Sequence, residues 1–188
     1  MKKGIRIIFP LFVLMVIGCA GSSKYMVEGT PVEKVPTGKS VIYFMRPSSL
    51  GFAINFQIWD GDHFVGLSQA KSYFAYVCDP GKHLFMGFAE NKVAVDADLA
   101  PGKSYYIGTA VRMGAWKARM LFTPVTKGSE LWDKVDGYKR DLKLIAVNEE
   151  EAEKWEALKK AEAQQFMSYF KTGEGQQDVV RLSREDGR

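Results

Sequence analysis

Short apolar runs separated by turn residues dominate the chain between about residues 39 and 125. Residues 41–45 are apolar at every position, which predicts a central strand buried on both faces. Residues 52–59 alternate instead, so that Phe52 and Ile54 are expected on one buried face with Phe56 and Ile58. Further strands are expected at 63–67, 73–78, 83–89, 93–99, 105–113 and 119–123.

Turn residues punctuate these runs at short intervals. Asp60-Gly61-Asp62 is expected to close a hairpin. Asp79-Pro80-Gly81-Lys82 and Ala100-Pro101-Gly102-Lys103 put proline where a turn needs φ near −65° and glycine where it needs positive φ. The pattern predicts a mainly β domain over residues 39–147, an antiparallel β-sandwich of about eight strands, with a partly closed barrel as the alternative.

The spacing becomes helical after this domain. Asn148 is placed to cap an amphipathic helix, three glutamates follow in its first turn, and Gly173 ends it. This C-terminal helix, 148–173, is expected either to cover an open face of the sandwich or to dock a partner protein. A shorter helix at 129–136 and a further strand at 144–147 precede it, and the polar residues 174–188 are expected to be disordered.

The N-terminus has the order of charge and hydrophobicity of a secretory signal. Lys2, Lys3 and Arg6 precede an apolar run over residues 7–17. At about 1.5 Å per helical residue this run reaches roughly 17 Å, against about 30 Å of bilayer hydrocarbon. Pro10 further disfavours a permanent spanning helix.

The apolar run ends in Val16-Ile17-Gly18-Cys19, which resembles the lipobox of bacterial lipoproteins. That resemblance implies a signal peptide over 1–18, cleavage between Gly18 and Cys19, and lipidation of Cys19 by a diacylglycerol. Ala20, in place of Asp, implies an outer-membrane destination by the sorting rule known for enterobacterial lipoproteins. Two or three acyl chains would hold the protein on the membrane, facing the periplasm. The alternatives are an ordinary signal peptide and a buried apolar segment with an incidental cysteine.

Residues 19–38 follow as the lipidated cysteine and a flexible tether. The stretch 21–38 is rich in Ser, Gly, Pro and Thr and has no periodicity. As a coil, those residues would span about 23 Å on average, so that the domain stands off the lipid surface.

Four turn-and-strand motifs lie within residues 39–125. They are Val41-Ile42-Tyr43 with Arg46-Pro47, Ile58-Trp59-Asp60-Gly61 with Val65-Gly66, Pro80-Gly81-Lys82-His83, and Pro101-Gly102-Lys103-Ser104-Tyr105-Tyr106-Ile107. On these motifs the chain resembles a family of uncharacterised bacterial lipoproteins with a domain of unknown function, related in style to PEGA-type β-domains. The resemblance implies a β-sandwich in the cell envelope and supplies no catalytic or binding residue.

Charge and cysteine content narrow the function classes. The chain of 188 residues has a formal net charge of +4, and three of those positive charges leave with the signal peptide. Little electrostatic basis for nucleic-acid binding remains. With Cys19 lipidated, Cys78 has no partner for an internal disulfide and is interpreted as a small buried apolar residue.

No motif points to a reaction or a cofactor. Gly38-Lys39-Ser40 and Gly102-Lys103-Ser104 lack the upstream glycine of a phosphate-binding loop and are interpreted as turns. The acidic pairs at 60–62 and 96–98 lack calcium-loop spacing, and His63, His83 and Cys78 are too scattered for a zinc site. The sequence therefore favours a non-enzymatic protein without a cofactor or a metal, although a Ser-His-Asp arrangement assembled in three dimensions stays open.

The chain has a surplus of aromatic residues, with 12 Phe, 8 Tyr and 4 Trp. Packing in the core explains most of them. The alternative is stacking on the sugar rings of peptidoglycan or lipopolysaccharide, for which Tyr76, Tyr105, Tyr106 and Trp116 are the candidates. We therefore expect a lipid-anchored envelope protein that binds another envelope protein or organises the envelope, with a glycan-binding module as the alternative.

Overall fold

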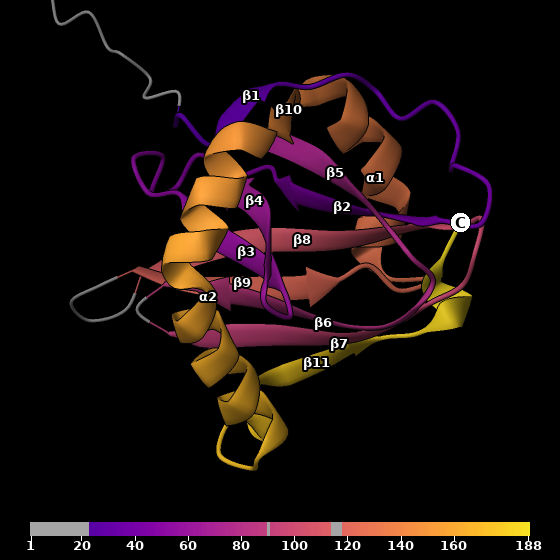
Figure 1. Cartoon of the computed structure of the whole chain (residues 1–188). Helices are drawn as coiled ribbons and strands as arrows, with labels where there is room; N and C mark the ends of the chain where they lie inside the picture. Colours follow the sequence, from indigo (N-terminus) through magenta and orange to yellow (C-terminus); the bar gives the residue numbers. More distant parts are fainter. Residues whose placement is uncertain (1–22, 90, 114–117) are drawn as a thin grey trace, which may run out of the picture.

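The computed structural model describes residues 23–89, 91–113 and 118–188 (Figure 1). The expected signal peptide, Gly18, Cys19 and Trp116 lie outside these residues. Eleven strands are described, in two sheets. The first sheet has the order β1 (Met26–Glu28), β10 (Lys143–Val147), β5 (Ser72–Cys78), β2 (Ser40–Arg46), β8 (Ser104–Met113) and β9 (Ala118–Pro124). The second has the order β11 (Val179–Leu182), β7 (Lys92–Leu99), β6 (Gly81–Phe88), β3 (Phe56–Asp60) and β4 (His63–Ser68).

The mainly β, sandwich-like architecture is confirmed, but the expected all-antiparallel pairing is wrong. β2 pairs antiparallel with β5 and parallel with β8, and two further parallel pairs join β10 to β5 and β11 to β7. A parallel pair needs a long crossover between its strands. Here β3 to β7 separate β2 from β8 along the chain, so no local turn signal in the sequence could reveal the pairing.

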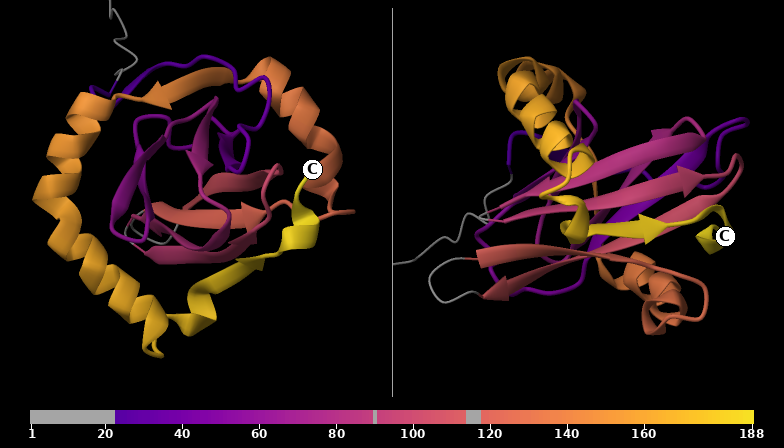
Figure 2. Two further views of the ribbon diagram at one scale, coloured as in Figure 1. Left: turned by 45° about the vertical axis from the view of Figure 1, so that its right-hand side comes forward. Right: turned by 90° about the horizontal axis from the view of Figure 1, so that it is seen from below.

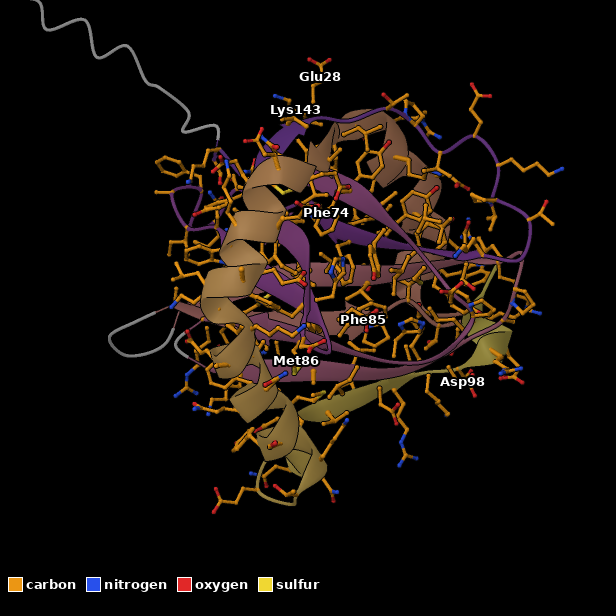
Figure 3. The ribbon with its side chains drawn as sticks, in the orientation of Figure 1. Glu28, Phe74, Phe85, Met86, Asp98 and Lys143 are labelled. Carbon is orange, nitrogen blue, oxygen red and sulfur yellow. The ribbon has the colours of Figure 1, made fainter. Side chains whose placement is uncertain are left out.

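The strand β2 has a buried face on both sides, as its sequence predicts. Ile42 and Phe44 point into the large core between the sheets, whereas Val41, Tyr43 and Met45 belong to a second core beneath α1 (Glu130–Asp141). Figure 3 shows the large core through Phe74, Phe85 and Met86, and it shows the exposed Glu28 and Lys143 at the rim of the first sheet.

The second helix, α2 (Glu149–Lys171), begins and ends where the sequence predicts. The side chain of Asn148 accepts a hydrogen bond from the backbone N–H of Glu151, and Gly173 has φ of 123°. Trp155 donates from Nε1 to Gln57 Oε1 at 3.0 Å, and Phe166 packs on Phe88. The helix therefore covers the domain, and it surrounds the strands together with α1, β10 and β11 (Figure 2).

The flexible tether expected over 19–38 is wrong for residues 26–38. Met26 is buried, and β1 pairs antiparallel with β10. Val32 and Val35 pack on the core beneath α1. In a flexible tether the side chains stay in solvent, whereas Met26, Val32 and Val35 pack against the domain.

The expected disorder of residues 174–188 is also wrong. This segment forms the 3₁₀ turns η1 (Gln176–Asp178) and η2 (Arg184–Asp186) on either side of β11. Leu182 is buried, and β11 pairs with β7 along its full length. The open edge of β7 supplies backbone hydrogen-bond partners to β11. The polar sequence of residues 174–188 gives no sign of this pairing.

The strand expected at 52–59 begins only at Phe56, because residues 47–55 form a loop. Phe52 and Ile54 are exposed there, although their alternation with Phe56 predicts a common buried face. Neither helix in the described part of the chain is long and apolar enough to cross a membrane.

Candidate functional site

A cleft of about 640 Å³ lies between the C-terminal part of α2 and strands β6, β7 and β11. Its walls combine basic, acidic and apolar side chains from four segments of the chain. They include Asp60, Lys82, His83, Leu84, Asp96, Met167, Phe170, Lys171, Gln176, Val179 and Arg181.

In this cleft, both ring nitrogens of His83 have a hydrogen-bond partner within the protein. Its Nδ1 lies 2.7 Å from Asp60 Oδ2, and its Nε2 lies 2.8 Å from the backbone oxygen of Asp79. The Asp60 hydrogen bond raises the pKa of His83, against the opposing effect of burial. The protonated ring can donate to both acceptors at once, which the neutral ring cannot do.

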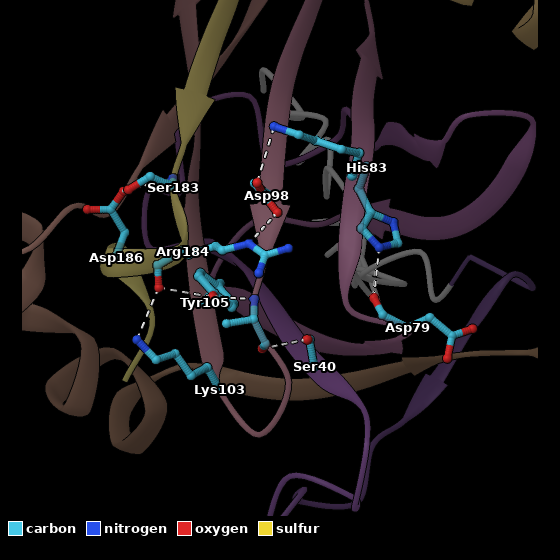
Figure 4. Close-up of polar contacts among 11 residues, drawn as sticks. Ser40, Asp79, His83, Asp98, Lys103, Tyr105, Ser183, Arg184 and Asp186 are labelled. Atoms are coloured by element: carbon cyan, nitrogen blue, oxygen red, sulfur yellow. Dashed lines mark hydrogen bonds and ion pairs between the residues drawn. The ribbon is translucent and has the colours of Figure 1, made fainter.

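This geometry decides what His83 can do chemically. A general base needs a ring nitrogen within reach of the proton that it removes. Both nitrogens of His83 already face protein oxygens, and its ring stacks on Phe85 at 5.5 Å between centroids. The residue therefore links the turn between β5 and β6, through Asp79 (Figure 4), to Asp60 at the end of β3.

A second groove continues from the cleft along β7 and β11, and both share Lys82, Asp96 and Arg181. Asp98 lines this groove, 2.8 Å from Arg184 Nε and 3.3 Å from Lys82 Nζ (Figure 4). The hydrogen bond from Arg184 lowers the pKa of the Asp98 carboxyl. The result is a long surface of mixed charge, built partly by the C-terminal segment.

The three candidate aromatic residues that the structure describes do not form a common exposed surface. Tyr105 is buried, and its hydroxyl accepts from the backbone N–H of Ala100 and donates to the carbonyl of Arg184. Tyr106 is buried on the other face of the same strand, against Tyr43. Tyr76 is half-buried, with its hydroxyl 3.4 Å from Asp60, and burial raises its pKa.

The remaining candidate residues, Cys78 and His63, have structural roles. Cys78 is buried, and burial raises the pKa of its thiol to about 12, which leaves it protonated and inert at neutral pH. His63, on the other side of the hairpin turn, pairs with Glu156 of α2 at 2.6 Å. Among the residues that the structure describes, no three His, Cys, Asp or Glu side chains gather closely enough to hold a metal ion.

Sequence reasoning missed the cleft residues Gln176, Val179 and Arg181, because the segment that carries them was expected to be disordered. The only local signal is the short apolar pair Val179-Val180 followed by Leu182.

A comparison of the chain with protein-family models, with curated proteins and with solved structures finds no match.

Proposed function

We propose that the protein is a lipid-anchored component of the bacterial envelope, held at the outer membrane and facing the periplasm, whose β-domain binds another envelope protein. The observation that carries this proposal is the N-terminal sequence, in which two lysines, a short apolar run and Gly18-Cys19 follow one another. Acyl chains on Cys19 would make the attachment to the membrane essentially permanent.

The chemistry of His83, in the cleft, and of Cys78, which does not line it, supports a binding role without a reaction. The two ring nitrogens of His83 face protein acceptors, and the Cys78 thiol is buried and protonated. Neither group offers a substrate a free base or a nucleophile.

The shape and charge of the same surface support a polypeptide as the ligand. Lys171 and Arg181 lie beside Asp96 and the apolar Met167 and Val179 along one continuous groove. An extended protein segment can present both charged and apolar side chains to such a surface. A glycan would need exposed ring faces, and Tyr105 and Tyr106 are buried.

The anchor is tested by Cys19→Ala in cells. We expect the variant to leave the membrane fraction while the domain stays folded, since the described sheets are built from Met26 onward. Membrane fractionation with a protease-resistance assay measures both properties. A variant that still fractionates with membranes would show that acylation is not the attachment.

The binding surface is tested by a photo-cross-linking amino acid placed at Lys171, on the rim of the cleft, in intact cells. Lys34 is the matched control, because it is an exposed lysine in the connection between β1 and β2 and does not line the cleft. We expect a discrete cross-linked protein from position 171 and none from position 34. The same products from both positions, or none from either, would count against a partner in the cleft.

A further inference from the structure

The loop between β2 and β3, residues 47–55, exposes three large apolar side chains. Phe52 is 79% exposed, Leu50 48% and Ile54 38%. The nine residues Pro-Ser-Ser-Leu-Gly-Phe-Ala-Ile-Asn contain no charged side chain. The turns at 60–62, 69–71, 79–80 and 100–103 each carry at least one. Exposed apolar side chains without a charge among them mark a surface that is covered in use.

A buried cation holds this loop in shape. The guanidinium of Arg46, at the end of β2, donates to the carbonyls of Leu50 and Gly51 at 2.8 and 2.9 Å and to that of Ile54 at 2.7 Å. Arg46 itself is buried, and its guanidinium lies over the ring of Phe56. The backbone is therefore fixed in a form that keeps the apolar side chains pointing outward.

The loop lies at the end of the sandwich where the described chain begins. The N–H of Leu67 contacts Met26 Sδ at 3.2 Å, and the carbonyl of the next residue, Ser68, accepts from Arg46 at 3.1 Å. The entry strand and Arg46, the residue that holds the loop, thus contact neighbouring residues of β4. In Figure 1 and in the right view of Figure 2, both lie at the left of the molecule.

The chain between the expected anchor and this end is short. Four residue steps separate Cys19 from Ser23, the first described residue. At no more than about 3.6 Å per residue they reach about 14 Å at most. An acylated Cys19 would therefore hold this end of the domain close to the membrane surface, in place of the stand-off that a long tether would allow.

We propose that the loop 47–55 inserts Leu50, Phe52 and Ile54 into the lipid surface as a second membrane contact beside the acyl chains. This inference rests on the lipid anchor proposed above. Apolar side chains enter the boundary between headgroups and acyl chains favourably, and here no charge has to be desolvated with them. Two attachments, unlike one, would fix the orientation of the domain and hence the direction in which its cleft faces.

The test uses the acylated full-length protein, purified from membranes and reconstituted into vesicles of phosphatidylethanolamine and phosphatidylglycerol. A Phe52→Cys variant carries an environment-sensitive fluorophore, and lipids with doxyl-labelled chains act as quenchers. The acylated Cys19 and the buried Cys78 do not compete for the label. Thr37→Cys is the matched control, because Thr37 is exposed just before the opposite end of β2. Leu50→Cys is a second position in the loop.

We expect the doxyl lipids to lower the fluorescence at positions 52 and 50 at least about twofold and to leave position 37 nearly unchanged. Weak quenching at all three positions, in protein that floats with the vesicles, would overturn the insertion and leave the anchor standing. A label at position 52 that is shielded from water yet not quenched would also overturn it, since a protein surface would then cover the loop. Protein that does not float and whose mass lacks acyl chains would overturn both proposals.

Discussion

At each end of the sandwich, a nitrogen-bearing side chain holds a loop or turn by hydrogen bonds to backbone carbonyls, but the side chain differs. At the end where the described chain begins, Arg46 holds the loop 47–55 through its backbone carbonyls. At the other end of the β2–β5 pair, His83 holds the turn at Asp79 and the carboxylate of Asp60. The arginine stays charged at every relevant pH, whereas the histidine is a titratable group whose pKa is raised by its hydrogen bond to Asp60. The contacts of Arg46 are therefore independent of pH in the physiological range, and those of His83 depend on its protonation.

The ends also differ in what they present. The arginine-held loop shows apolar side chains and no charge, and the histidine lies in a cleft with basic and acidic groups on its walls. We interpret the first as a surface for lipid and the second as a surface for protein. Substitutions at either end test this comparison, and their expected effects on the free energy of unfolding differ in size.

The largest effect is expected from Arg46→Ala. The substitution leaves buried or half-buried carbonyls of the loop without their charged donor, at a cost of about 3–5 kcal/mol in the free energy of unfolding. Arg46→Lys should recover only part of it, because a single ammonium cannot reach the same set of oxygens. Urea unfolding measures both, with the exposed Arg119→Ala as the control. A loss under about 1 kcal/mol for Arg46→Ala would mean that the loop holds its own shape.

A smaller effect, and one that depends on pH, is expected from His83→Gln. Because the pKa of His83 is raised in the folded state, protonation favours folding. Its stabilisation of about 1–2 kcal/mol should be fully present below about pH 6.5 and disappear as the pH rises through the raised pKa. Unfolding of wild type and variant at pH 6 and pH 9 measures the difference. An equal difference at both pH values would refute the brace.

The smallest effect is expected from Phe52→Ser, at under about 0.5 kcal/mol, because the side chain is 79% exposed and packs on little. The same urea experiment measures it. A large loss would show that Phe52 supports the fold and is not available to a membrane. Arg46→Ala removes the hydrogen bonds to the loop backbone, whereas Phe52→Ser removes an exposed loop side chain. Comparing the two variants shows which of these supports the fold.

The sequence predicted those elements whose signals are local. The hairpin of β3 and β4 turns at Gly61 with φ of 59°, the turn after Asp79-Pro80 has Gly81 at 125°, and α2 starts after Asn148. In each case the residue type at one position dictates the backbone there. The sandwich-like class follows from such signals.

What the sequence could not supply depends on distant partners. Residues 52–55 alternate like a strand, yet the guanidinium of Arg46 takes up the carbonyls of Leu50, Gly51 and Ile54. β1 and β11 are three and four residues long, too short for a pattern, and they form because β10 and β7 have open edges. The cleft depends on β11 and so could not be foreseen either.

The anchor on which both surfaces depend is tested most directly by the intact mass of the mature protein extracted from membranes. We predict a chain that begins at Cys19 and carries the added mass of a diacylglycerol, with or without a third acyl chain. A protein that retains residues 1–18, or one that begins at an unmodified Cys19, would contradict the account.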